Sequence, residues 1–106
     1  MTTFDKRKDA FEAKYALDEE HRFLAYARRN RALGLWAASK LGKTGADADD
    51  YAKDVVNSDL IEAGEEDVFR KVFGDLQSAG CDVSEDDVRD AMLSHLDAAM
   101  AEIRKR

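Results

Sequence analysis

Proline is absent from this chain, so none of its 106 residues forces a helix to end. Alanine occurs 17 times and leucine nine times, whereas valine, isoleucine and threonine together number 11. Residues that favour helices therefore outnumber the β-branched residues that favour strands. No pair of alternating apolar segments is joined by an Asn-Gly or Asp-Gly turn. The sequence predicts an all-α protein.

Four segments have apolar residues at the three-and-four spacing of a helix that is buried on one face. They cover roughly residues 22–41, 44–64, 68–80 and 84–106. Thr44 and Ser84 stand at the N-cap positions of the second and fourth segments, and Gly64 and Gly80 end the second and third. Because the three connections are short, we expect antiparallel neighbours and an up-and-down four-helix bundle over residues 21–106.

Individual residues of the first segment predict how it packs. Its apolar arc runs from Phe23 through Asn30 to Leu41. Gly34 lies on this arc, and we expect it to be a point of contact with a neighbouring helix. Trp36 lies off the arc, so we expect it to cover a second edge of the core. The alternative is that Trp36 offers a flat stacking surface.

The first 20 residues follow a different pattern. Phe4, Phe11 and Tyr15 lie seven and then four residues apart, which puts all three in one narrow band of a helical face. By the same rotation, the apolar arc of the next helix is centred about 120° away. An isolated helix of this length is marginal in water, so we expect residues 1–20 to be a flexible amphipathic segment that orders on a partner. The alternative is that the band packs back on the bundle.

Charge is unevenly distributed along the chain, whose net charge is -6. Six basic residues and no acidic ones lie between Glu20 and Asp47, whereas residues 44–106 carry 17 acidic residues against seven basic ones. An acidic body is repelled by phosphates, so we expect no nucleic-acid partner, and a DNA-binding helix is the least favoured interpretation. We interpret the basic residues Arg28, Arg29 and Arg31 as a solvated face that pairs with the acidic helices. Contact with a protein or a nucleotide is the alternative.

Residues that could carry catalysis or hold a metal ion are few. Residues 42–44 resemble the end of a phosphate-binding loop, but the first glycine that this motif requires is missing. His21 and His95 lack the spacing of zinc or di-iron ligands, and Cys81 has no histidine near it in the sequence. We therefore expect a protein that is not an enzyme and requires no cofactor.

The same sequence indicates where the protein works. A lone cysteine cannot close an internal disulfide, which favours a reducing compartment. No export signal is visible, and the longest stretch without a charge, residues 32–39, is far shorter than the ~20 apolar residues needed to cross a bilayer. We expect a cytoplasmic protein without direct membrane insertion.

Several short motifs, in their order and spacing over nearly the whole chain, carry a resemblance to a known family. They are FDKR at 4–7, FEAKY at 11–15, ARRN at 27–30, GLWAA at 34–38 and AGEEDVFRKV at 63–72. With them, the chain resembles the zeta-subunit inhibitor family of alphaproteobacterial F-type ATP synthases. The resemblance implies a regulatory four-helix bundle, attached peripherally to the membrane-bound synthase, that inhibits ATP hydrolysis. Its mobile N-terminal arm would dock at an interface of the alpha, beta and gamma subunits of the catalytic head and block rotation.

Two sets of site residues follow from this resemblance and from the residue chemistry. The inhibitory arm would consist of aromatic anchors and of charged residues that set the register: Phe4, Arg7, Lys8, Phe11, Glu12, Lys14 and Tyr15. Similar proteins are associated with ADP or ATP, so weak regulatory nucleotide binding is expected. The candidates are Arg28, Arg29 and Lys43 for the phosphates and Trp36 for the base. The alternative function is a small nucleotide-sensing or adaptor bundle that acts through its basic first helix.

Overall fold

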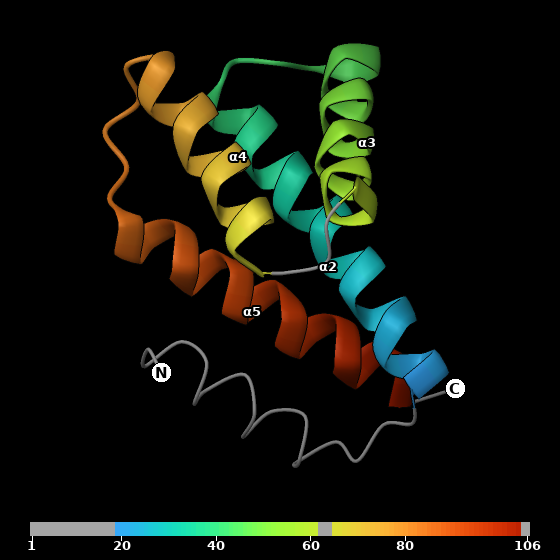
Figure 1. The fold of residues 1–106 in the computed structure, drawn as a ribbon. Coiled ribbons are helices and arrows are strands. Elements are labelled where there is room, and N and C mark those ends of the chain that lie inside the picture. The colour runs from blue at the N-terminus through green and yellow to red at the C-terminus, as the bar shows by residue number, and fades with distance from the viewer. Residues whose placement is uncertain (1–18, 62–64, 105–106) are drawn as a thin grey trace.

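The structure is a computed structural model and describes residues 19–61 and 65–104. These residues form four α-helices and no strand (Figure 1). The helices are α2 (Glu19–Lys40), α3 (Gly45–Ile61), α4 (Glu65–Ser78) and α5 (Glu85–Arg104). Each helix contacts the next, and α2 also contacts α4 and α5, so the four close into an up-and-down bundle. The predicted fold class is confirmed. Residues 1–18 and the predicted stop at Gly64 lie outside the described residues.

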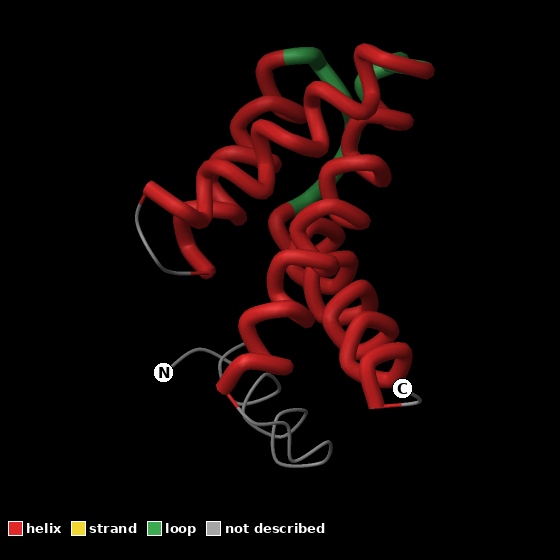
Figure 2. Tube along the Cα trace, turned by 90° about the vertical axis from the view of Figure 1, so that its right-hand side faces the viewer, coloured by secondary structure: helices red, strands yellow, loops and turns green. Residues whose placement is uncertain are grey.

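Glycines end two of the helices in the way that the sequence predicts for Gly80. Gly80 has a φ of 76°, in the left-handed region that favours glycine. Its N–H donates to the Gln77 carbonyl at 3.0 Å, and the Cys81 N–H donates to the Leu76 carbonyl at 3.0 Å. This pair of bonds is a Schellman motif, which satisfies carbonyls at the end of α4. Gly42, with a φ of 77°, ends α2 in the same way. In Figure 2 the connections that follow these two helices are loops.

The start of α5 is fixed by side chains of its own first turn. The Asp87 N–H donates to Ser84 Oγ at 3.0 Å, and the Ser84 N–H donates to Asp87 Oδ2 at 3.0 Å. This reciprocal pair is a capping box with aspartate in place of the usual glutamate. Val83 and Val88 flank the cap and pack in one apolar cluster, so they close the helix entry as a hydrophobic staple. The predicted N-cap at Ser84 is confirmed.

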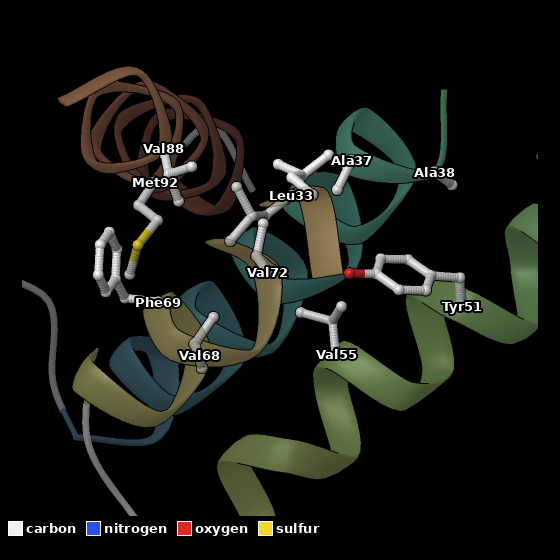
Figure 3. Close-up of a cluster of buried hydrophobic side chains, with 11 residues drawn as sticks. Leu33, Ala37, Ala38, Tyr51, Val55, Val68, Phe69, Val72, Val88 and Met92 are labelled. Atoms are coloured by element: carbon white, nitrogen blue, oxygen red, sulfur yellow. The ribbon is translucent and has the colours of Figure 1, made fainter. Parts of the chain in front are cut away.

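The larger core lies where all four helices meet. Figure 3 shows Leu33 of α2, Val55 of α3, Val72 of α4 and Val88 of α5 pointing toward one another. All four side chains are completely buried. Burying each of them contributes roughly 1.5 to 3 kcal/mol, which makes this cluster the main source of stability. The apolar stripe that the sequence predicts for α4 supplies Val68, Phe69, Val72 and Leu76 to it.

A polar tie joins α3 to α4 at the edge of this core. The Tyr51 hydroxyl donates to Asp75 Oδ2 at 2.9 Å, and Lys71 Nζ donates to the same oxygen at 3.2 Å. Burial, followed by the hydrogen bond to Asp75, raises the pKa of Tyr51 above its ordinary value of 10. Tyr51 therefore stays a neutral donor across the physiological pH range.

A second, smaller core joins only the first half of α2 to the second half of α5. It contains Ala25 of α2 and, from α5, Leu96, Ala99, Met100 and Ile103, with Tyr26 packed against it. In Figure 1 the start of α2 and the end of α5 converge here, away from α3 and α4. Because α5 covers one face of α2 at this end, Phe23 is 67% exposed. The predicted place of Phe23 on the buried arc is therefore wrong.

Helix α2 contacts α3 closely at Gly34, where the sequence predicts a point of contact with a neighbouring helix. A Cβ atom built on Gly34 would lie 2.7 Å from Ala52 Cα and 3.3 Å from Val55 Cβ on α3. Contacts under 3.0 Å to a backbone atom cannot be relieved by turning a side chain, so α2 and α3 would have to move apart. Glycine at this position allows both helices to share the core with α4.

Replacing Gly34 by alanine should lower the free energy of unfolding by about 1 to 3 kcal/mol, the usual cost of overpacking. Gly74 in α4 is the matched control, because a Cβ there would meet no atom within 4 Å. Gly74→Ala should stabilise the protein by about 0.5 to 1 kcal/mol, since alanine favours a helix interior over glycine. Urea unfolding of the two variants measures both values. Equal effects of the two changes would contradict the close crossing.

Candidate functional site

The basic residues of α2 do not form one uniform surface. Arg28 Nη1 donates to Glu102 Oε1 of α5 at 2.7 Å, and Arg31 Nη2 lies 3.5 Å from Asp49 Oδ1 of α3. These two arginines therefore pair with acidic residues of neighbouring helices, as the sequence predicts. Both pairs are partly exposed, and such pairs are worth about 0 to 1 kcal/mol. Their main effect is to neutralise charge on the basic helix.

Arg29 differs from its two neighbours, because it is completely buried. It lies one turn after Ala25, on the face of α2 that packs on α5. Its Nε donates to Asn30 Oδ1 at 2.7 Å, and its guanidinium carbon lies 5.2 Å from the centre of the Tyr26 ring. The predicted solvated basic face is therefore wrong at Arg29. Arginine is usually exposed, but Arg29 is buried because its face of α2 packs against α5.

His95 of α5 is close enough to this buried arginine to respond to its charge. The imidazole is half-buried. Burial lowers the pKa of His95 below its ordinary value of 6.5, and the positive charge of Arg29 lowers it further. Near neutral pH the folded protein therefore favours the neutral imidazole. His95 therefore lies at the boundary between the interior of the bundle and its surface.

Trp36 lies at the other end of α2 and has two neighbours of different kinds. Its ring packs, partly buried, against the larger core, which confirms the predicted core edge. Lys40 Nζ lies 5.1 Å from the ring centre. The same ring borders a groove of about 450 Å³ between the end of α2 and the first half of α5. We call it the Trp36 groove, and its lining consists of Trp36, Lys40, Asp82, Val83, Asp87, Asp90, Ala91 and Ser94.

The four candidate nucleotide residues are not brought together in one site. Arg28 is engaged with Glu102, and Arg29 is buried. Trp36 follows Arg28 by eight residues, which is about 12 Å along a helix. Lys43 is exposed in the turn between α2 and α3 and does not line the Trp36 groove. These four side chains therefore do not form a common pocket. Binding of ADP or ATP stays a prediction.

The seven predicted arm residues, from Phe4 to Tyr15, lie outside the described residues. Within the described residues, no group of three or more His, Cys, Asp or Glu side chains could hold a metal ion. In residues 19–61 and 65–104, no helix has the length and apolar character needed to span a membrane.

Cys81 is a half-buried free thiol that donates to the Lys40 carbonyl at 3.3 Å.

In the region around Ser84 the sequence predicts only the cap of the last helix. In the structure, Asp87 and Asp90 also line the Trp36 groove, together with Asp82 from the preceding loop. The spacing of three between Asp87 and Asp90 is a signal that both lie on one helical face. Nothing in the sequence indicates that this face meets Trp36, because that depends on how α5 packs against α2.

The comparison with known families decides what kind of protein this is. The family model for ATPase inhibitor subunit zeta matches residues 1–102. The chain belongs to this family. The resemblance seen in the sequence motifs is thereby confirmed. Membership gives the chain an inhibitory, regulatory role and implies interaction with ATP synthase.

A solved structure supports the same fold for this zeta-family chain. A protein determined by NMR in solution has 44% sequence identity to it and a TM-score of 0.68. The match covers 79% of this chain and 95% of that chain. A search of curated proteins found no match.

The pKa of His95 predicts a pH dependence of stability. Because the folded-state pKa lies below the unfolded value of about 6.5, the unfolded chain binds a proton more readily. The contribution of neutral His95 is therefore complete above pH 6.5 and is lost as the pH falls through the folded-state pKa. Urea unfolding of wild type and His95→Gln between pH 8 and pH 5 measures this effect. We expect the free energy of unfolding of the wild type to fall relative to that of His95→Gln as the pH is lowered. A difference between the two free energies that does not change with pH would contradict this prediction.

Proposed function

We propose that this protein inhibits ATP hydrolysis by the catalytic head of the F-type ATP synthase through its N-terminal arm. In this proposal the arm docks at an interface of the alpha, beta and gamma subunits and blocks rotation in the hydrolytic direction. The observation that carries the proposal is that the family match includes the segment with the aromatic band of Phe4, Phe11 and Tyr15. The inhibitor itself is proposed to have no catalytic activity.

The aromatic band suits a docking segment for physical reasons. Aromatic side chains bury about 150 to 250 Å² each, so three of them can anchor a short helix in a groove. The surrounding charges, among them Arg7, Lys8 and Glu12, would fix the register of the docked segment. An arm that bound every rotational state with equal affinity would not change the populations of those states. The arm must therefore bind one rotational state of the head more tightly than the others.

The bundle would serve as the rigid body to which this arm is attached. Its two apolar clusters and its capped helices hold α2 in place, and α2 begins at Glu19, inside the predicted arm of residues 1–20. A tethered segment has a high effective concentration at its site once the bundle contacts the same partner. The proposal therefore assigns docking to the arm and retention to the bundle, on the cytoplasmic side of the membrane.

Phe11→Asp should raise the concentration needed for half-inhibition of ATP hydrolysis by at least about 30-fold, because a buried anchor costs 2 kcal/mol or more. Ala13→Asp is the matched control, since it adds the same charge about 200° away, on the opposite face of the same helix. The measurement is hydrolysis by the isolated catalytic head with increasing inhibitor. Removal of residues 1–18 should abolish inhibition.

Circular-dichroism melts of both variants separate docking from folding. The bundle should melt at nearly the same temperature in Phe11→Asp as in wild type. A large drop in melting temperature would instead favour an arm that packs on its own bundle. Undiminished inhibition by the chain without residues 1–18 would rule out the arm mechanism.

A further inference from the structure

The first turns of α2 carry two large apolar side chains that the bundle leaves uncovered. Phe23 is 67% exposed and Leu24 is 41% exposed, and both lie about one turn after the start of the helix at Glu19. Among the described residues, the one other large apolar side chain exposed to a similar degree is Leu35, which lies further along the same helix. We call Phe23 and Leu24 together the Phe23 patch.

The patch exists because the apolar arc of α2 extends past the helices that cover it. Further along the same arc, Ala27 is partly buried, and Asn30 and Ala37 are buried. In Figure 1 the start of α2 lies away from α3 and α4, and the end of α5 converges on it. Because α5 packs on the face with Ala25, the described helices give Phe23 little cover.

The surroundings of the patch resemble the centre of a small interface. The exposed residues that precede it, Glu20, His21 and Arg22, are all polar or charged. Aromatic residues are enriched in the buried centres of protein interfaces, and the rims of these interfaces are polar. Covering an aromatic side chain with apolar atoms of a partner is favourable, because the apolar area is removed from water. The patch is therefore suited to an apolar partner surface.

The length of the chain before α2 indicates which partner is close to the patch. Only residues 16–18 lie between Tyr15, the last aromatic residue of the predicted arm, and Glu19, where α2 begins. An extended chain spans at most about 3.6 Å per residue and a helix about 1.5 Å per residue, so Phe23 lies within about 20 Å of Tyr15. A standard interface of about 800 Å² per partner is about 30 Å across. A large partner that holds Tyr15 therefore also comes within reach of Phe23.

Charge disfavours two other occupants of the patch. Each chain carries a net charge of -6, so two copies of the protein repel each other. The same net charge is repelled by an anionic lipid surface. The partner that holds the arm is already brought to the patch by the short connection, so it pays neither cost again.

We propose that the Phe23 patch is a second contact with the ATP synthase catalytic head and packs on an apolar surface beside the interface that holds the arm. This inference rests on the proposed function, because it names the same partner and needs the arm to be docked there. The arm blocks rotation, and the Phe23 patch fixes the bundle at the point where the arm enters the head. Two contacts joined by so short a connection bind more tightly than either contact alone.

Phe23→Ala should raise the concentration needed for half-inhibition of ATP hydrolysis by at least about 5-fold, because it truncates an aromatic anchor. The matched control is Leu35→Ala, which truncates an exposed apolar side chain of the same helix about 18 Å further along its axis. The control should change that concentration by less than about twofold. Both side chains are exposed, so both variants should melt at nearly the wild-type temperature. Equal half-inhibition by the two variants would overturn the proposal.

A photoreactive side chain at position 23 identifies the surface that covers it. The full-length protein with p-benzoylphenylalanine in place of Phe23 is irradiated together with the isolated catalytic head at full inhibition. Mass spectrometry should locate the cross-link on an alpha, beta or gamma subunit. The same photoreactive residue in place of Leu35 is the control and should give little of this product. A fully inhibited head without a cross-link from position 23 overturns the proposal.

Other occupants of the patch would give different products in the same experiment. A cross-link that reaches only residues 1–18 of the same chain would assign the patch to the protein's own N-terminal segment. A cross-link that reaches only a second copy of the chain would assign it to self-association. Each of these results overturns the proposal.

The variants also separate this inference from the arm mechanism. If Phe11→Asp weakens inhibition while Phe23→Ala matches Leu35→Ala and position 23 gives no cross-link to the head, the arm stands and the patch proposal fails. If Phe11→Asp has no effect while Phe23→Ala weakens inhibition and position 23 cross-links to the head, the arm mechanism fails and the patch contact stands.

Discussion

The close crossing of α2 and α3 at Gly34 is the constraint on which the rest of the bundle depends. Without a side chain at this point, Ala52 of α3 approaches the backbone of α2. That approach lets Leu33 and Ala37 of α2 reach the same core as Val55 of α3 and Val72 of α4. Because α2 also contacts α5, its position sets the place of every other helix.

The division of the interior into two clusters follows from the length of α2 and α5. Both helices are longer than α4, and their far ends pack only on each other among the described residues. The smaller cluster therefore depends on one helix pair, and the buried Arg29 has its guanidinium carbon 5.2 Å from the ring centre of Tyr26, which packs against this cluster. This end of the bundle therefore has the smaller of the two apolar clusters, with a buried arginine beside it.

This arrangement suits an inhibitor that works by attachment. The four-helix end supplies rigidity through the larger core and the capping box of α5, and it also carries the Trp36 groove. The two-helix end carries the start of α2 at Glu19.

The sequence alone determined the presence of the four helices, the helix ends marked by Ser84 and Gly80, and the family. Helical periodicity, the Ser84 cap and the glycine at position 80 act within a few residues of each other, so local rules suffice to predict them. The sequence also predicted that Gly34 contacts a neighbouring helix, because glycine lies there on the apolar arc of its helix. The aromatic band of residues 4–15 and its role stay a prediction, because those residues lie outside the described part of the structure.

Only the tertiary structure decided which faces of the long helices are covered. Periodicity predicted that Phe23 is buried and Arg29 solvated, whereas α5 covers the face with Ala25 and Arg29 and leaves Phe23 exposed. The Trp36 groove likewise joins side chains from α2 with acids from the start of α5. Local sequence rules describe one helix at a time, and the rotation of each helix is set by the partner against which it packs.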